Sequence, residues 1–384
     1  MRELQVVDVS DPLALWEPLR AALSGDGPAV LPRPGGAKLI HTAPLEVPED
    51  VALVIETSGT TGSPKRVLLS GEALLASAAM AQDALGGPGT WLLALPAHYI
   101  AGVQVLTRSL GGGVPPRALH PQPFSSVAVA DIAASLMDGA GNGPLYTSLV
   151  PAQLQRLLDD AATMPVLAEL MRRFDRILVG GQSLPRALAD RVKDAGWRVT
   201  TTYGSSETAG GCVWDQKPLA GVAIREIDGR IALSGPMLAQ GYLDNPEGST
   251  RSFVTLEGTR WYRSDDAGFI DQEGLLNVQG RLDDVIISGG VKVSLGEIER
   301  VIHESLDVPG ALVVAQADAQ WGTVPVVVAP GVVELSALRS LIQAQLGPAA
   351  RPHRTLVMNP IPVLASGKPD RLAVTQAVAA GNST

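Results

Sequence analysis

Apolar strand-like runs and helix-like segments alternate along residues 51–204, and this alternation restricts the fold more than any other feature of the sequence. Continuous apolar runs such as residues 51–57 are typical of strands that are covered on both faces. The segments between them have helical spacing, and several end at glycines. The alternation predicts a mainly parallel α/β sheet. The expected strands are residues 51–57, 91–96, 175–181 and 197–204, and the expected helices are residues 71–85, 100–110, 151–161, 166–173 and 184–196.

The pattern changes after about residue 210. An Asp-Gly turn signal within residues 225–235 predicts a hairpin, and residues 261–281 have the spacing of short strands joined by tight turns. From Leu282 onward, strands and helices in mixed order predict a compact α+β unit. We therefore expect a large N-terminal α/β domain with a β-rich subdomain over residues 1–282, and a small C-terminal domain over residues 283–384.

The composition excludes several functional classes. The sequence has 384 residues, with 30 Lys and Arg against 39 Asp and Glu, and a formal net charge of −9. This acidic balance argues against a general nucleic-acid binder, which would need a basic face, although single loops can still bind phosphate. The one cysteine, Cys212, excludes a disulfide within the chain and argues against a cysteine zinc site. The charged start and the lack of an apolar run of about 18 residues predict no signal peptide and no membrane insertion, so we expect a cytoplasmic protein.

The strongest local signal is the run TSGTTGSPK at residues 57–65, which follows the first apolar strand. Its glycines allow a tight turn, and its hydroxyls and backbone amides can donate to phosphate oxygens. Lys65 adds a mobile cation. The spacing differs from that of a P-loop NTPase, so the run predicts a phosphate-binding loop of another kind.

Together with further motifs, this loop resembles the adenylate-forming superfamily of acyl- and aryl-CoA ligases, peptide-synthetase adenylation domains and luciferases. The other matching segments follow in the family's order from residue 95 to residue 371. They are LPAHYIAG (95–102), LVGGQSLP (178–185), TTYGSSETAG (201–210), GRIALSGPMLAQGYL (229–243), YRSDDAGFIDQEG (262–274), GRLDDVIISGGVKVSLGEIE (280–299) and ASGKPDR (365–371). The resemblance implies the adenylate-forming fold and a reaction in two steps. A carboxylate attacks the α-phosphorus of ATP and releases pyrophosphate, and a thiol such as that of coenzyme A then displaces AMP.

The resemblance implies roles for residues around the nucleotide. Lys65 and the loop would hold the β- and γ-phosphates, Glu207 would bind Mg²⁺ because a hard cation prefers carboxylate oxygen, and Thr208 would contact the α-phosphate. Tyr203 would stack on adenine, and Asp266 and Arg281 would bind the ribose. The remaining nucleotide-binding candidates are Thr57, Ser58, Gly59, Thr60, Thr61, Gly62, Gly180, Gly181, Gln182, Gly204 and Ser205.

The same resemblance implies that the small domain moves. Lys368 would bridge the α-phosphate and the attacking carboxylate in the first step and stabilise the charge that develops there. Asp283 would be the hinge about which the small domain rotates, bringing the Gly289-Gly290 loop in to line a thiol tunnel for the second step.

Two features distinguish this chain within the superfamily. The phosphate loop begins at residue 57, so most of the usual N-terminal subdomain is expected to be missing or much reduced. Ser264-Asp265 also stands where Thr-Gly is common, a mild departure.

The predicted acid pocket comprises His98, Tyr99, Gly102 and Arg108. An aromatic gate at Tyr99 suits a flat acid, and Arg108 could bind a second carboxylate. In these respects the chain most resembles the short o-succinylbenzoate–CoA ligases of menaquinone synthesis.

Three alternatives stay open at this point. The chain could be a CoA ligase for another aryl or acyl acid, a stand-alone adenylation enzyme that loads a carrier protein, or a ligand-binding homologue without catalysis. The intact Lys65, Glu207, Asp266, Arg281 and Lys368 argue against the last. The sequence also leaves open whether the chains form a homo-oligomer.

Overall fold

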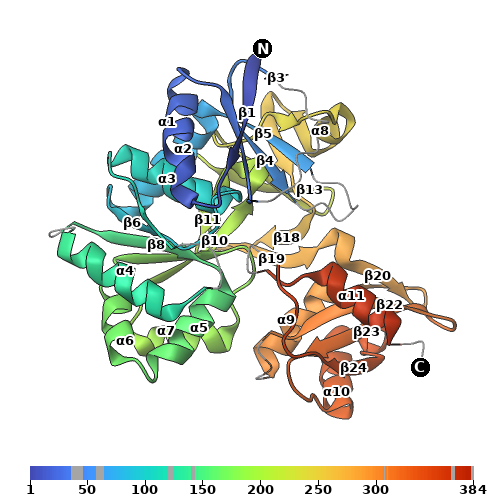
Figure 1. Ribbon diagram of the computed structural model, residues 1–384. Coiled ribbons are helices and arrows are strands. Elements are labelled where there is room, and N and C mark those ends of the chain that lie inside the picture. The colour runs from blue at the N-terminus through green and yellow to red at the C-terminus, as the bar shows by residue number, and fades with distance from the viewer. Residues whose placement is uncertain are drawn as a thin grey trace.

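The computed structural model describes residues 1–35, 46–57, 65–119, 124–139, 143–306, 308, 310–364 and 368–381, with residues 138 and 139 described by their backbone alone. Figure 1 shows layered sheets and helices from the N-terminus to about residue 280, and a separate group of strands and helices beside them that ends at the C-terminus. No helix in the described ranges is both long enough and apolar enough to cross a bilayer.

Seven of the described strands form the central sheet. They are β6 (Thr90–Leu93), β7 (Arg117–Ala118), β8 (Leu145–Leu149), β9 (Arg176–Gly180), β10 (Val199–Ser205), β11 (Gly210–Trp214) and β12 (Lys217–Pro218). The order is β12-β11-β10-β9-β8-β6-β7, and the neighbours from β10 to β7 are parallel, whereas β11 and β12 run antiparallel. This confirms the predicted α/β class.

Helices cover both faces of this sheet because neighbouring strand residues point in opposite directions. Leu92 and Val179 pack into one core and Leu93 and Leu178 into another. Figure 1 shows the corresponding helices on opposite sides. The first side carries α4 (Ser126–Gly139), α5 (Pro151–Ala161), α6 (Pro165–Arg172) and α7 (Arg186–Ala195), and the second carries α2 (Gly71–Leu85) and α3 (Ile100–Gly111). The sequence pattern predicts neither α4 nor β8. All five residues of β8 are buried, but the polar residues Thr147 and Ser148 interrupt the apolar run that would indicate a buried strand.

Six other described strands form a second sheet in the order β15-β5-β4-β2-β1-β3. They are β1 (Arg2–Asp8), β2 (Ala29–Arg33), β3 (Glu46–Val47), β4 (Val51–Thr57), β5 (Lys65–Ser70) and β15 (Gly241–Tyr242), with η1 (Pro12–Leu15) and α1 (Trp16–Ser24) packed beside them. The strand predicted at residues 51–57 therefore lies in this sheet and not in the central one. It pairs antiparallel with β5, and Thr57 is opposite Lys65.

The β-rich region follows as predicted. Four described strands, β13 (Ala223–Ile227), β14 (Arg230–Ser234), β16 (Phe253–Leu256) and β17 (Thr259–Arg263), form a sheet with α8 (Pro246–Ser252) beside it. β13 and β14 are the predicted hairpin. A separate pair, β18 (Asp266–Ile270) and β19 (Leu276–Arg281), runs antiparallel, with Asp266 opposite Arg281.

The short helix η3 (Leu282–Asp284) leads from β19 into the last group of elements. These are β20 (Val285–Ser288), β21 (Val291–Ser294), α9 (Leu295–Ser305), β22 (Leu312–Asp318), β23 (Gly322–Ala329), α10 (Leu335–Leu346), η4 (Pro348–Ala350), β24 (Arg354–Val357) and α11 (Arg371–Ala380). Two apolar clusters made only of residues beyond 285 form the core of this group. The sequence pattern predicts α9, β22, β23 and α10 but not β21, β24 or α11.

Candidate active site

The β4–β5 hairpin presents the predicted phosphate loop at its open end. Thr57 and Lys65 face each other across the two strands, and the Thr57 hydroxyl donates to the Lys65 carbonyl over 3.4 Å. Five of the predicted phosphate-binding residues lie outside the described part of the chain: Ser58, Gly59, Thr60, Thr61 and Gly62. Their role stays a prediction.

A tight turn, η2 (Ser206–Thr208), joins the ends of β10 and β11. The Ser205 amide donates to the Thr208 hydroxyl over 2.9 Å, and that hydroxyl donates to the Gly210 carbonyl over 2.8 Å. Thr208 is fully buried. To donate to an α-phosphate as predicted, the Thr208 hydroxyl would have to give up its hydrogen bond to the Gly210 carbonyl.

Glu207 lies on the same turn and is only 6% exposed. Its carboxylate accepts a hydrogen bond of 2.9 Å from the hydroxyl of Tyr242 on β15. Burial, together with the nearby Glu207 charge, raises the pKa of Tyr242, so this phenol stays a donor. The Lys65 ammonium lies 5.5 Å from the centre of the Tyr242 ring. Sequence reasoning missed this role of Tyr242, although the residue lies within a quoted motif.

Tyr203, Asp266 and Arg281 meet at the ends of β10, β18 and β19. The Tyr203 hydroxyl donates to Asp266 over 2.7 Å, and Arg281 lies 3.8 Å from the other oxygen of that carboxylate. Burial raises the pKa of Asp266. The structure therefore brings together an aromatic ring, a carboxylate and a guanidinium that the sequence predicts for adenine and ribose. Gly204, the residue after Tyr203, lies in β10 beside them.

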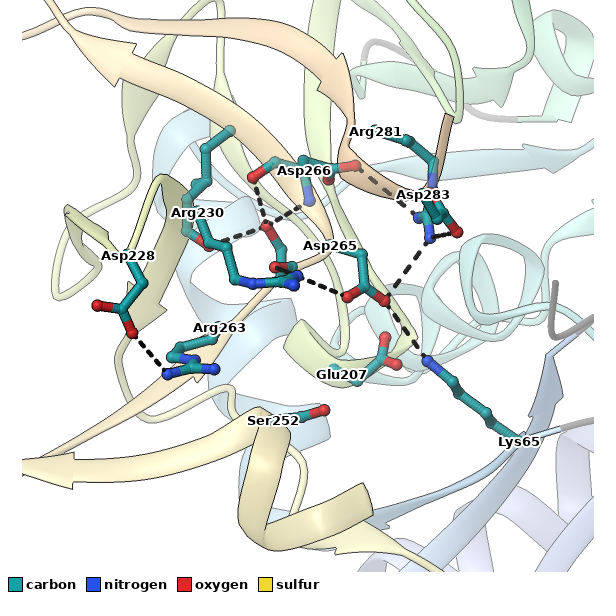
Figure 2. Close-up of polar contacts among 12 residues, drawn as sticks. Lys65, Glu207, Asp228, Arg230, Ser252, Arg263, Asp265, Asp266, Arg281 and Asp283 are labelled. Carbon is teal, nitrogen blue, oxygen red and sulfur yellow. Dashed lines mark hydrogen bonds and ion pairs between the residues drawn. The ribbon is translucent and has the colours of Figure 1, made fainter. Parts of the chain in front are cut away.

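Asp265, which departs from the family pattern in sequence, lies among three cations. Arg230 lies 2.8 Å from one of its carboxylate oxygens, and Lys65 and Arg281 lie 3.6 and 3.7 Å from the other. Figure 2 shows Asp265 between these side chains, with Glu207 close by. A carboxylate therefore lies beside Lys65, the cation that is predicted to hold the β- and γ-phosphates.

Lys368 reaches the site from the C-terminal group of elements. A Cβ built on Gly181 would lie 2.9 Å from Lys368 Cε, so the lysine side chain lies directly against this residue, and the φ of +85° favours glycine there. Burial lowers the pKa of Lys368, and the Arg281 charge lowers it further, whereas Asp266 raises it. The Leu364 amide donates to the Lys368 carbonyl over 2.7 Å. The predicted lysine therefore lies beside the predicted adenine segment, where Gly180 ends β9 and Gln182 is exposed.

The predicted hinge residue, Asp283, is hydrogen-bonded to Arg281, one of the residues predicted to bind the ribose. Arg281 donates two hydrogen bonds to Asp283, of 2.7 and 2.8 Å. Gly289 and Gly290 form the turn between β20 and β21 with φ values of +57° and +83°. A single arrangement of the chain does not test rotation about Asp283 or a thiol tunnel at this turn, so both stay predictions.

Three of the four predicted acid-pocket residues, His98, Tyr99 and Gly102, lie at the start of α3. The rings of His98 and Tyr99 are 4.1 Å apart between centres, and burial lowers the pKa of His98. Tyr99 is the N-cap of the helix. Gly102 packs so closely on the Pro96 carbonyl that a Cβ there would overlap it.

Arg108 is also on α3 and is buried, with 8% of its surface exposed. Its guanidinium lies 5.4 Å from the centre of the Trp91 ring, and among the described residues its buried Nε makes no hydrogen bond and no carboxylate forms an ion pair with it. Burial lowers its pKa to about 10, so the group keeps its charge at neutral pH. A buried cation without an anion is unfavourable. The site therefore favours a ligand that supplies a negative group.

The sequence is similar to those of known enzymes. The model of the AMP-binding enzyme family matches residues 5–243. A Mycobacterium tuberculosis protein named probable 2-succinylbenzoate–CoA ligase is 39% identical, over 98% of this chain and 98% of its own length. A Listeria monocytogenes protein named 2-succinylbenzoate–CoA ligase is 31% identical, over 83% of this chain and 68% of its own.

Solved structures show the same fold. The o-succinylbenzoate CoA synthetase (MenE) of Bacillus subtilis, in complex with the acyl-adenylate intermediate OSB-AMP, is 26% identical with a TM-score of 0.71, over 97% of this chain and 78% of that one. Escherichia coli MenE with bound OSB-AMS has a TM-score of 0.74 at 24% identity, over 98% of this chain and 87% of that one, a similarity that supports the fold alone.

Proposed function

The chain belongs to the AMP-binding enzyme family, and from that premise we propose that it is an ATP-dependent 2-succinylbenzoate–CoA ligase of menaquinone synthesis. In the first step a carboxylate oxygen of the acid bonds to the α-phosphorus of ATP, and the bond to pyrophosphate breaks. In the second step the coenzyme A thiol loses its proton, its sulfur bonds to the acyl carbon, and AMP leaves. The observation that carries the choice of acid is the buried Arg108, which has no carboxylate partner among the described residues.

The acid has two carboxylates, and we propose that they go to opposite ends of the pocket. The flexible succinyl chain extends its carboxylate toward the Thr208 turn and Lys368. The ring carboxylate stays with Arg108, where a charge-assisted hydrogen bond in a dry site is strong. Tyr99 supplies a flat face for the ring. A mono-acid would leave Arg108 without an anion, which gives the enzyme its selectivity.

The triphosphate would lie between the β4–β5 hairpin and the Thr208 turn. Lys65 stabilises the negative charge that gathers on the pyrophosphate. Glu207 is the candidate ligand for Mg²⁺, and a single carboxylate fits because magnesium in such sites is bound by one or two carboxylates together with substrate phosphates. When bound, Mg²⁺ neutralises charge on the leaving group. Tyr242 orients Glu207 for this role through its hydrogen bond.

Lys368 would stabilise the first transition state by contacting both the α-phosphate and the attacking carboxylate. Its position against Gly181 supports the adenylating arrangement. We propose that residues 283–384 then rotate as one domain against residues 1–282. Asp283 would be the hinge, and Gly289 and Gly290 would line the path of the thiol. We also propose a cytoplasmic location, because ATP and coenzyme A are available there.

The test is CoA-dependent release of AMP from ATP, with the products identified by mass spectrometry. The acids are 2-succinylbenzoate, benzoate, octanoate and a mixture of amino acids. We expect selective turnover of 2-succinylbenzoate to its CoA thioester. Turnover of another acid in its place would refute the assignment of substrate, and an adenylate that never forms a CoA thioester would indicate a carrier-protein acceptor.

A further inference from the structure

Helix α3 carries a second buried polar side chain that lacks a partner. Gln104 is 1% exposed, and neither its amide nitrogen nor its amide oxygen makes a hydrogen bond within the described residues. The other polar side chains of this turn are satisfied. Thr107 donates to the Val103 carbonyl over 3.0 Å, and Ser109 donates to the Val105 carbonyl over 2.8 Å.

Gln104 lies close to the proposed acid site. A Cβ built on Gly210 would lie 3.2 Å from Gln104 Cγ, and the Gly210 carbonyl accepts the Thr208 hydroxyl. Arg108 follows one helical turn later, about 6 Å along the axis. Gln104 therefore lies between the turn predicted to hold the α-phosphate and the guanidinium proposed to hold the second carboxylate.

A buried amide without hydrogen-bond partners is unfavourable. The presence of Gln104 at this place therefore points to a ligand group that forms a hydrogen bond with its amide. The acid proposed for this site has a ketone between its two carboxylates. We propose that Gln104 is a specificity residue whose amide nitrogen donates to the ketone oxygen of 2-succinylbenzoate, while Arg108 binds the ring carboxylate. This inference rests on the proposed function and adds to it a residue that recognises the middle of the substrate.

The experiment pairs one substitution with one change in the substrate. Gln104→Met keeps the length and shape of the side chain and removes both polar atoms. The analogue 4-(2-carboxyphenyl)butanoate has a methylene group in place of the ketone and keeps both carboxylates. We expect the wild-type enzyme to prefer the ketone about 10-fold in kcat/KM, as one hydrogen bond allows, and the variant to lose that preference.

Gln153→Met is the matched control. The Gln153 amide nitrogen donates to the Ala94 carbonyl over 3.1 Å, and its oxygen accepts from the Val150 amide over 3.0 Å. This glutamine has partners at both ends, so its replacement should leave the ketone preference unchanged while lowering the melting temperature. Gln104→Met should melt at or above the wild-type temperature, because it removes a buried amide that lacks partners in the unliganded chain.

The outcomes separate the two proposals. If the wild-type enzyme converts 2-succinylbenzoate and Gln104→Met keeps the ketone preference, the role of Gln104 is refuted and the proposed function stands. A lower melting temperature for Gln104→Met with an unchanged preference would identify a merely structural side chain. If the wild-type enzyme does not convert 2-succinylbenzoate, both proposals fail.

Discussion

Tyr242→Phe removes one hydroxyl group from the site and leaves the ring in place. That hydroxyl lies 2.9 Å from Glu207 and 3.4 Å from the Ser252 hydroxyl, and Glu207 is 6% exposed. A hydrogen bond to a charged group contributes about 1.5–3 kcal/mol. If that energy orients Glu207 for the first step, its loss lowers the rate roughly 10- to 150-fold, since each 1.36 kcal/mol is a factor of ten.

The assay is ATP–pyrophosphate exchange with 2-succinylbenzoate over a series of magnesium concentrations. We expect the variant to exchange more slowly and to need more magnesium for half-maximal rate. Tyr146→Phe is the control, because that hydroxyl donates to the Leu85 and Gly87 carbonyls and makes no hydrogen bond to Glu207. Exchange by Tyr242→Phe within twofold of the wild-type rate, with unchanged magnesium dependence, would refute the role of Tyr242 and weaken that of Glu207.

Four further predictions concern single substitutions. Lys368→Ala should abolish adenylation but spare thioester formation from supplied acyl-adenylate in single-turnover assays, and equal loss in both steps would count against domain rotation. Asp265→Asn should lower the KM for ATP up to about fivefold, because an exposed ion pair worth up to about 1 kcal/mol no longer competes for Lys65, whereas a raised KM would contradict this. Arg108→Met should reduce kcat/KM for 2-succinylbenzoate about 100-fold while sparing an analogue without the ring carboxylate, and equal loss for both acids would exclude a selective role. Glu56 is desolvated, yet Arg33 and Arg66 lower its pKa below 4.5. Its contribution to stability is therefore present above pH 4.5 and lost as the pH falls through the lowered value, so the melting-temperature advantage over Glu56→Gln should shrink below pH 4.5. An advantage that is independent of pH would contradict this.

Much of the fold can be predicted because apolar runs and caps act locally. The helix at residues 71–85 has the predicted bounds, since the Ser70 hydroxyl accepts from the Ala73 amide and Gly86 ends the helix at a φ of +83°. The sheet to which a strand belongs is set by distant partners. The sequence therefore predicts the strand at residues 51–57 correctly but places it in the wrong sheet, because its partner β5 begins with the charged pair Lys65-Arg66 and does not have a strand-like pattern.

The candidate site, too, can be predicted only in part from the sequence. Motifs identify Lys65, Glu207, Asp266 and Lys368, because each stands at a fixed place in a short run of residues. Contacts across the sequence are not visible in such runs. The hydrogen bond from Tyr242 to Glu207 joins residues 35 positions apart. The cations around Asp265 come from three separate strands, and only the folded chain brings them together.

Burial is the other property that the sequence conceals. From the sequence alone, Arg108 could equally be an arginine on the helix surface, and nothing distinguishes Gln104 from the other residues of the predicted helix. Both are more than nine-tenths buried because α3 packs against the central sheet on one side and α2 on the other. Among the described residues the Gln104 amide and the Arg108 Nε make no hydrogen bond, and only the folded chain shows this.

The most direct measurement compares kcat/KM for 2-succinylbenzoate and 4-oxo-4-phenylbutanoate in CoA-dependent AMP release. The two acids differ only in the ring carboxylate that Arg108 is proposed to bind. We expect 2-succinylbenzoate to be preferred about 100-fold, as the loss of a charge-assisted hydrogen bond in a buried site requires. Equal turnover of the two acids, or no turnover of 2-succinylbenzoate, would contradict the proposal that this site is built for a dicarboxylic acid.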